Sequence, residues 1–145
     1  MARAEASIVI NRPVKEVCDY LDDPANSPEW EGNALEIEKT SEGPTAVGTT
    51  YRGLATFLGR RLELSSEVTE FEPYRLTKQK VTAGPLSIER TELLEPVEGG
   101  TRFTLIVEGE LRGFFRLADA IVVRVMQRDM EGDVARLKDI LEAEG

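Results

Sequence analysis

Apolar and polar positions alternate in the first segment of the chain. A period of two predicts a β-strand with one buried face, and here it covers residues 4–10. Ile8 and Ile10 fall on the apolar face, whereas Glu5 and Ser7 fall on the other. We therefore expect the fold to begin with a strand.

Helical spacing replaces the alternation after this strand. Apolar residues recur at i, i+3, i+4 and i+7, which predicts a helix with one buried stripe; they are Val14, Val17, Cys18 and Leu21. Asn11 is a polar cap candidate, and Pro13 suits a first helical turn. Asp22-Asp23-Pro24 should end this helix, and Ser27-Pro28-Glu29 should begin a second, very short helix that carries Trp30.

Short alternating segments, separated by turn residues, occupy the middle of the chain from residue 34 to residue 109. The predicted strands cover residues 35–38, 49–58, 61–68, 76–83, 86–94 and 102–108. Glycine and proline mark most of the reversals between them. Short turns between consecutive strands favour an antiparallel meander.

A long helix is predicted from about residue 113 to residue 143. Its apolar residues form two stripes, displaced from each other by roughly a third of a turn. The first stripe includes Leu117, Ile121 and Val125, and the second runs from Met126 to Leu141. The shift falls near residues 128–132, so we expect a bend there or two halves that face different neighbours.

Composition narrows the possible functions. The 145 residues suit a single domain, residues 1–145, and the formal net charge of −9 disfavours nucleic-acid and anionic-membrane binding. The chain has no histidine and one cysteine, which excludes histidine-dependent nucleophilic catalysis, histidine-ligated metals and multi-cysteine metal sites. No signal peptide or run of about 18 apolar residues is visible. We expect a cytoplasmic protein without stable membrane insertion.

The predicted order of elements is α+β, with a curved antiparallel sheet wrapped around a long C-terminal helix. Several motifs occur in order along the whole chain. The first is the segment Ile8-Val-Ile-Asn-Arg-Pro-Val-Lys-Glu-Val-Cys-Asp-Tyr-Leu-Asp-Asp-Pro, followed by Trp30. The later ones, in order, are Val47-Gly48-Thr49, Phe71-Glu72-Pro73, Leu94-Glu95-Pro96 and Gly99-Gly100-Thr101-Arg102-Phe103. Together these motifs resemble the SRPBCC superfamily, also called START-like, which includes the polyketide cyclase/dehydrase families.

This resemblance implies a helix-grip fold, with a seven-stranded sheet, two short helices and a cavity between the sheet and the long helix. Superfamily members bind lipids, plant hormones, flavonoids or coenzyme Q, activate chaperones or, in a minority, act as enzymes. Members that hydroxylate rings use histidine iron ligands, so the absence of histidine excludes that branch. We expect no metal and no other cofactor.

Arg90 and Glu92 are the most informative candidates for a polar site in the cavity. They share a strand face with Leu86, Ile88 and Leu94, so strict alternation would point both charges inward. Buried charges need partners and are costly without a use. The alternative is a β-bulge that returns both side chains to solvent.

The other candidate ligand contacts are aromatic and aliphatic. Trp30 either stacks on a ligand at the mouth of the cavity or packs the short helix onto the sheet. Tyr51 offers a phenol on the same strand face as Phe57. The remaining candidates are Leu64, Phe103 and Leu105 on the strands, and Phe115, Leu117, Ile121, Val122 and Val125 on the long helix, which would face the last strand.

Three functions are compatible with these residues. The first is a carrier or binding protein for a small hydrophobic ligand such as a lipid, a quinone or a polyketide. The second is a cyclase or dehydratase in which Arg90, Glu92 and Tyr51 assist enolisation or loss of water. The third is a protein-interaction module, for which an exposed stripe at Met126, Met130 and Val134 would be the binding surface; that stripe would also suit a homodimer.

Overall fold

The computed structural model describes residues 2–84, 86–111 and 119–143. Seven strands and three helices follow the predicted order in this part of the chain, with one short 3-10 helix, η1, between α1 and α2. Their bounds are β1 (Ala2–Ile10), α1 (Val14–Asp22), η1 (Pro24–Asn26), α2 (Ser27–Trp30), β2 (Ala34–Lys39), β3 (Thr50–Phe57), β4 (Arg60–Glu72), β5 (Leu76–Ala83), β6 (Leu86–Val97), β7 (Gly100–Leu111) and α4 (Asp119–Ala143).

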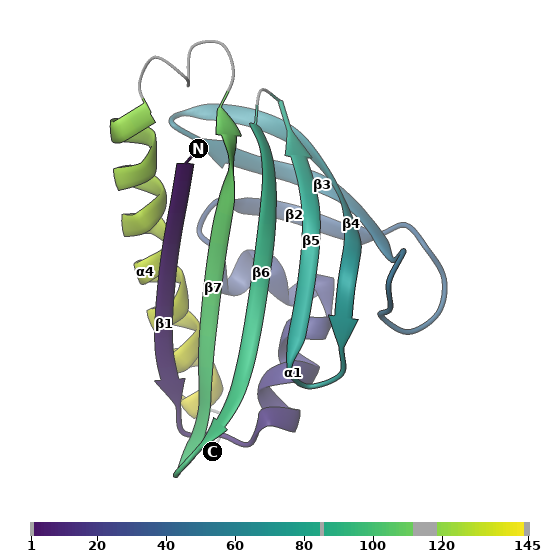
Figure 1. Ribbon diagram of the computed structural model, residues 1–145, viewed down its shortest axis with the longest axis vertical. Coiled ribbons are helices and arrows are strands. Elements are labelled where there is room, and N and C mark those ends of the chain that lie inside the picture. The colour runs from purple at the N-terminus through teal and green to yellow at the C-terminus, as the bar shows by residue number, and fades with distance from the viewer. Residues whose placement is uncertain (1, 85, 112–118, 144–145) are drawn as a thin grey trace.

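All seven strands form one antiparallel sheet in the order β1-β7-β6-β5-β4-β3-β2. Strands that follow one another in sequence from β2 to β7 are also neighbours in the sheet, as the short turns predicted. The first strand, β1, pairs with the last strand, β7. Figure 1 shows the sheet curving so that β2 and β3 pass behind β4 to β6, with the helices on its concave side. The α+β helix-grip prediction is confirmed.

The first helix begins differently from the prediction. Pro13 itself occupies the N-cap position of α1, and its carbonyl accepts hydrogen bonds from the amides of Glu16 (3.0 Å) and Val17 (3.2 Å). The expectation that Asn11 caps this helix is wrong. The amide of Asn11 instead donates to the Glu142 carboxylate at 2.9 Å, near the end of α4. The start of α1 is therefore tied to the C-terminal helix.

The two halves of α4 pack against different parts of the sheet. Met130, Val134, Leu137 and Leu141 join Phe103, Leu105 and Val107 of β7 in one buried cluster, with residues of β1, α1 and α2. Val122 belongs to a second cluster, with Phe57, Leu62, Ala83 and Leu86. Residues 119–143 form one helix, so the two stripes reflect two sets of neighbours. The predicted packing of Val122 and Val125 against β7 is wrong.

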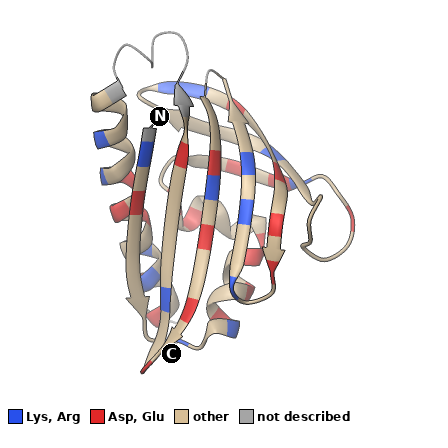
Figure 2. Cartoon of the chain, in the orientation of Figure 1, with Lys and Arg blue, Asp and Glu red and all other residues tan. Residues whose placement is uncertain are grey.

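Charged residues are spread over the outside of this framework. Figure 2 shows Asp and Glu distributed over strands and helices, with no single acidic block. Several ion pairs between described residues are exposed, such as Arg102 with Glu95 at 2.9 Å, and pairs of this kind add little stability. None of the helices in the described ranges is long and apolar enough to cross a membrane.

Candidate ligand-binding cavity

A cavity of about 270 Å³ lies between the concave face of the sheet and the helices. Strands β3 to β7 supply most of its wall, including Ala55, Leu64, Val81 and Ile88. The wall is completed by Met126 and Met130 of α4 and by residues of α1 and α2. Most of the lining is apolar, which suits a hydrophobic ligand.

Seven of the residues predicted from the sequence lie on the cavity wall: Trp30, Tyr51, Phe57, Leu64, Arg90, Glu92 and Leu105. Phe103 does not; it is fully buried, and its ring packs edge to face against Trp30 with a centroid distance of 5.9 Å and an interplanar angle of 82°. Trp30 thus packs α2 onto the sheet and also borders the cavity.

Three of the helix residues predicted to line the cavity, Ile121, Val122 and Val125, do not lie on its wall. Ile121 is 62% exposed, and Val122 and Val125 pack in the second apolar cluster. Phe115 and Leu117 lie outside the described residues. Met126 and Met130 face the cavity instead, because the stripe that continues toward the C-terminus is the one that crosses the concave face of the sheet.

Strand β6 carries Arg90 and Glu92 into the cavity. Its pairing with β5 is unbroken from residue 86 to residue 93, and its pairing with β7 from residue 86 to residue 97. Ile88 and Leu94, which share this strand face, also line the cavity. The β-bulge alternative is therefore wrong, and strict alternation holds.

Arg90 lies between two carboxylates. Its Nη1 donates to Glu31, in the connection that follows α2, and its Nη2 donates to Glu92 Oε2 at 3.4 Å. The side chains of Glu31, Arg90 and Glu92 are only 14%, 21% and 15% exposed. Arg90 Cζ also lies 5.6 Å from the centre of the Trp30 ring, within range of a cation–π contact. We call Glu31, Arg90 and Glu92 the charged cluster.

The surroundings of the charged cluster perturb both members on β6. Burial lowers the pKa of Arg90, but the negative charges of Glu31 and Glu92 outweigh it and raise that pKa above its usual value. Burial also raises the pKa of the Glu92 carboxyl, although Arg90 opposes this shift. Arg90 is therefore a permanent cation, whereas Glu92 holds a proton more readily than an exposed glutamate.

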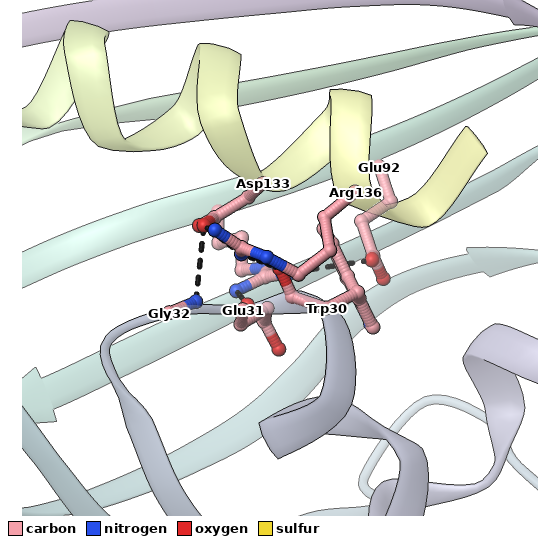
Figure 3. Close-up of polar contacts among 7 residues, drawn as sticks. Trp30, Glu31, Gly32, Glu92, Asp133 and Arg136 are labelled. Atoms are coloured by element: carbon pink, nitrogen blue, oxygen red, sulfur yellow. Dashed lines mark hydrogen bonds and ion pairs between the residues drawn. The ribbon is translucent and has the colours of Figure 1, made fainter. Parts of the chain in front are cut away.

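A second set of contacts holds the α2–β2 connection against α4. The buried Asp133 carboxylate accepts from the Gly32 amide at 3.0 Å and pairs with Arg136 at 3.2 Å. Arg136 Nη1 also donates to the Trp30 carbonyl at 2.6 Å. Figure 3 shows these residues on α4 facing the segment that carries Glu31. This anchoring fixes the position from which Glu31 reaches Arg90.

The cavity wall near α1 carries further polar groups. Thr45 donates to Asp22 at 2.5 Å, which ties the β2–β3 connection to the end of α1. Burial raises the pKa of the Tyr51 phenol and of the Cys18 thiol. Tyr74, in the β4–β5 turn, lines the cavity while 48% exposed, so this side of the wall reaches the surface.

Sequence reasoning missed Glu31 and the two methionines. Glu31 follows Trp30 and belongs to no segment with a regular apolar pattern. The only signal for its role was that a buried Arg90 needs an acidic partner. The stripe containing Met126 and Met130 is visible in the sequence, but it was linked to a binding surface only under the protein-interaction alternative and was not proposed to line the cavity. Met130 is in fact buried. No group of three His, Cys, Asp or Glu side chains suited to a metal ion occurs among the described residues.

Solved structures with the same architecture cover almost the whole chain. TTHA0849 from Thermus thermophilus is 20% identical, with a TM-score of 0.83 and coverage of 99% of both chains. The Zhui aromatase/cyclase from Streptomyces sp. R1128 is 15% identical, with a TM-score of 0.82 and coverage of 97% of this chain and 93% of that one. A Rhodobacter sphaeroides protein is 24% identical, with a TM-score of 0.70 and coverage of 98% and 93%.

These similarities agree in fold, and the sequence itself identifies the family. No curated protein sequence matches the chain. The sequence model described as polyketide cyclase / dehydrase and lipid transport matches residues 1–142. With its helix-grip sheet and a cavity under the long helix, the chain belongs to the polyketide cyclase / dehydrase and lipid transport family.

Proposed function

We propose that the protein binds a small hydrophobic molecule, such as a lipid, a quinone or a polyketide-like compound, as a carrier or binding protein. The observation that carries this proposal is the largely apolar cavity of about 270 Å³ with one charged cluster on its wall. Ligand pockets usually measure roughly 300–1,000 Å³ and combine apolar walls with a few polar groups. Apolar burial would supply the affinity, and the polar groups would fix the orientation.

Native mass spectrometry of the purified protein tests this proposal, followed by denaturing extraction to identify what was bound. Ala55 lines the cavity, so Ala55→Trp should fill part of it and abolish a one-to-one adduct. Leu54→Trp is the matched control, because the neighbouring side chain on β3 points to the opposite face of the sheet. An adduct that survives equally in Ala55→Trp, with the circular dichroism unchanged, would place the ligand elsewhere.

A neutral dye covers the case in which the ligand is lost during purification. Nile red is uncharged and fluoresces in apolar surroundings, so it should bind the wild-type protein and the Leu54→Trp variant and should bind Ala55→Trp weakly. If Nile red binds none of the three proteins and no adduct is found, the proposal is wrong.

The cyclase or dehydratase alternative keeps support from the inward position of Arg90 and Glu92. A carboxyl whose pKa is raised by burial suits general acid–base catalysis near neutral pH, and Tyr51 lies on the same cavity wall. Hydrogen–deuterium exchange at the acidic carbon of a hydrophobic 1,3-diketone measures enolisation directly. Glu92→Gln and Arg90→Ala should slow an enzymatic exchange, whereas the exposed Glu95→Gln should not. Exchange no faster than in buffer would remove this alternative.

The protein-interaction alternative loses its main sequence feature. Met130 is 6% exposed and Val134 is 3% exposed, both inside the first apolar cluster. The stripe that suggested a partner surface or a homodimer is therefore used within the chain. A cytoplasmic location remains part of the proposal, supported by the single, unpaired Cys18.

A further inference from the structure

The charged cluster contains the only guanidinium group that the described residues place deep in the cavity wall. Arg75, the other arginine of the wall, lies in the β4–β5 turn with its side chain 61% exposed and pairs with Glu72 at 3.0 Å. Because an arginine on an apolar wall is the usual partner of a ligand carboxylate or phosphate, the state of Arg90 decides what the polar end of a ligand can be.

The Arg90 guanidinium is already engaged within the protein. Nη1 and Nη2 each donate to a carboxylate, Glu31 and Glu92 respectively. Nε is buried, with less than 1 Å² of exposed surface and no hydrogen-bond partner among the described residues. A carboxylate binds arginine best through two parallel hydrogen bonds along one edge. To bind Arg90 in that geometry, a ligand carboxylate would have to displace Glu31 or Glu92 or reach the buried Nε.

The balance of charges on the cavity wall also disfavours an anionic ligand. Among the described residues, the cavity is lined by five carboxylates and two guanidinium groups: Asp22, Glu31, Glu72, Glu92 and Asp133 against Arg75 and Arg90. Within the charged cluster, two carboxylates, Glu31 and Glu92, face the single positive charge of Arg90, and Asp22 is close enough to influence Glu92 electrostatically. An anionic ligand end would meet like charges in a poorly solvated site.

A ligand would therefore find hydrogen-bond acceptors here. Carboxylate oxygens accept hydrogen bonds and each can hold more than one. Glu92 Oε2 makes only a long contact of 3.4 Å with Arg90, so it has capacity for a shorter bond to a donor. An O–H group can supply this bond without bringing an additional charge into the cavity.

Resting on the function proposed above, we propose that the cavity selects hydrophobic ligands whose polar end is an uncharged hydrogen-bond donor, an alcohol or a phenol, and discriminates against carboxylates. The ligand chain would lie along the apolar wall, and its hydroxyl would donate to Glu92. Arg90 would hold that carboxylate in place and would not contact the ligand itself.

Three competitors of the same chain type test this selectivity by displacement of Nile red at pH 7. Decan-1-ol is the donor, nonyl methyl ether is its isomer without a donor, and decanoate is the anion. The expected order of affinity is alcohol, then ether, then acid, with decanoate weaker than decan-1-ol by at least about tenfold. Decanoate binding as tightly as the alcohol overturns the proposal, and equal binding of alcohol and ether overturns the role of the donor.

Two variants separate the charged cluster from general surface charge. Glu92→Gln removes one negative charge from the cavity while keeping the side-chain shape, so it should improve decanoate binding relative to decan-1-ol. Glu95→Gln removes a negative charge from the same strand at an exposed position, and it should leave the ratio unchanged. A similar change of ratio in both variants overturns the assignment to Glu92.

The same experiment distinguishes failure of this inference from failure of the proposed function. If Nile red binds wild-type protein but the competitors show no preference against the acid, only the selectivity is wrong. If Nile red does not bind and native mass spectrometry finds no adduct, the proposed binding function is wrong as well.

Discussion

Removing Arg90 should destabilise the protein more than removing any exposed arginine. In Arg90→Met, the carboxylates of Glu31 and Glu92 would remain in the cavity wall, largely buried and without their shared cation. Methionine keeps most of the length of the side chain, so the substitution removes charge with little loss of packing. The expected result is a large loss of free energy of unfolding at pH 7.

The size of this loss follows from the geometry. Two unit charges about 4 Å apart interact by about 4 kcal/mol at an effective dielectric constant of about 20. Residual exposure of 14–21% weakens each interaction, and removing Arg90 also removes the cost of burying it. Breaking buried pairs from one side typically costs about 3–5 kcal/mol, so we expect about 3 kcal/mol.

Urea unfolding followed by far-ultraviolet circular dichroism measures the effect without relying on the fluorescence of Trp30, which lies against Arg90. With a denaturant dependence of about 2 kcal/mol per molar urea, the midpoint should fall by about 1.5 M. Arg102→Met, which breaks an exposed pair with Glu95, should change the midpoint little. A shift for Arg90→Met no larger than that of Arg102→Met would refute the reasoning.

Acid should partly restore the Arg90→Met variant. Burial already raises the pKa of Glu92 in the wild-type protein, and Arg90 is what opposes this rise. Without Arg90 the folded-state pKa rises further, so the folded variant binds a proton more tightly than the unfolded chain. The stability tied to this proton is present below the unfolded pKa of about 4.3 and is lost as pH rises through the folded pKa.

The difference between wild type and variant should therefore be smaller at pH 4.5 than at pH 7. The triple substitution Arg90→Met, Glu31→Gln, Glu92→Gln should also recover most of the loss, because an uncharged site no longer buries unpaired charge. A triple variant no more stable than Arg90→Met would mean that packing, and not charge, explains the defect.

Three further predictions concern other parts of the framework. Asp133→Ala should cost about 1–3 kcal/mol in chemical unfolding, because it leaves a backbone amide of the α2–β2 connection without its acceptor. Gly84→Ala should lower the melting temperature more than Gly59→Ala; both glycines have positive φ, but only at Gly84 would a Cβ lie 2.8 Å from a methyl group of Leu62. The rate at which iodoacetamide alkylates Cys18 should still increase above pH 9.0, because burial raises the pKa of the thiol. Saturating the cavity with Nile red should slow this reaction, and an unchanged rate would contradict the position of Cys18 on the cavity wall.

The sheet could be predicted from the sequence because each strand carries its own alternation. The turn at Gly59 and the unbroken alternation from Leu86 to Leu94 needed no long-range information. Arg90 and Glu92 interrupt an apolar face but not its period of two, and the period decided their direction. For charged residues within a regular strand, the alternation of the strand therefore predicts the direction of the side chains better than their polarity does.

The helix could not be placed in the same way. Its two stripes were visible, but their angular positions do not say which part of a curved sheet each one meets. Met130 and Val134 belong to the face that packs on β1 and β7, whereas Val122 packs on β3 to β6. Assigning the stripes requires the angle at which α4 crosses the sheet, and that angle depends on contacts between segments far apart in sequence.

The charged cluster contributes both to the stability of the fold and to the polar part of the cavity wall. Glu31 comes from the connection after α2, and Arg90 and Glu92 come from the sheet, so their pairing holds the α2 segment against β6 from inside the cavity. A ligand hydroxyl bound to Glu92 would contact one of the groups that fix this segment. Ligand binding would then stabilise the folded state through a contact that the fold already uses. Because Arg90 is already paired with Glu31 and Glu92, the cluster would offer the ligand a carboxylate that accepts a hydrogen bond and would not offer it an unpaired guanidinium.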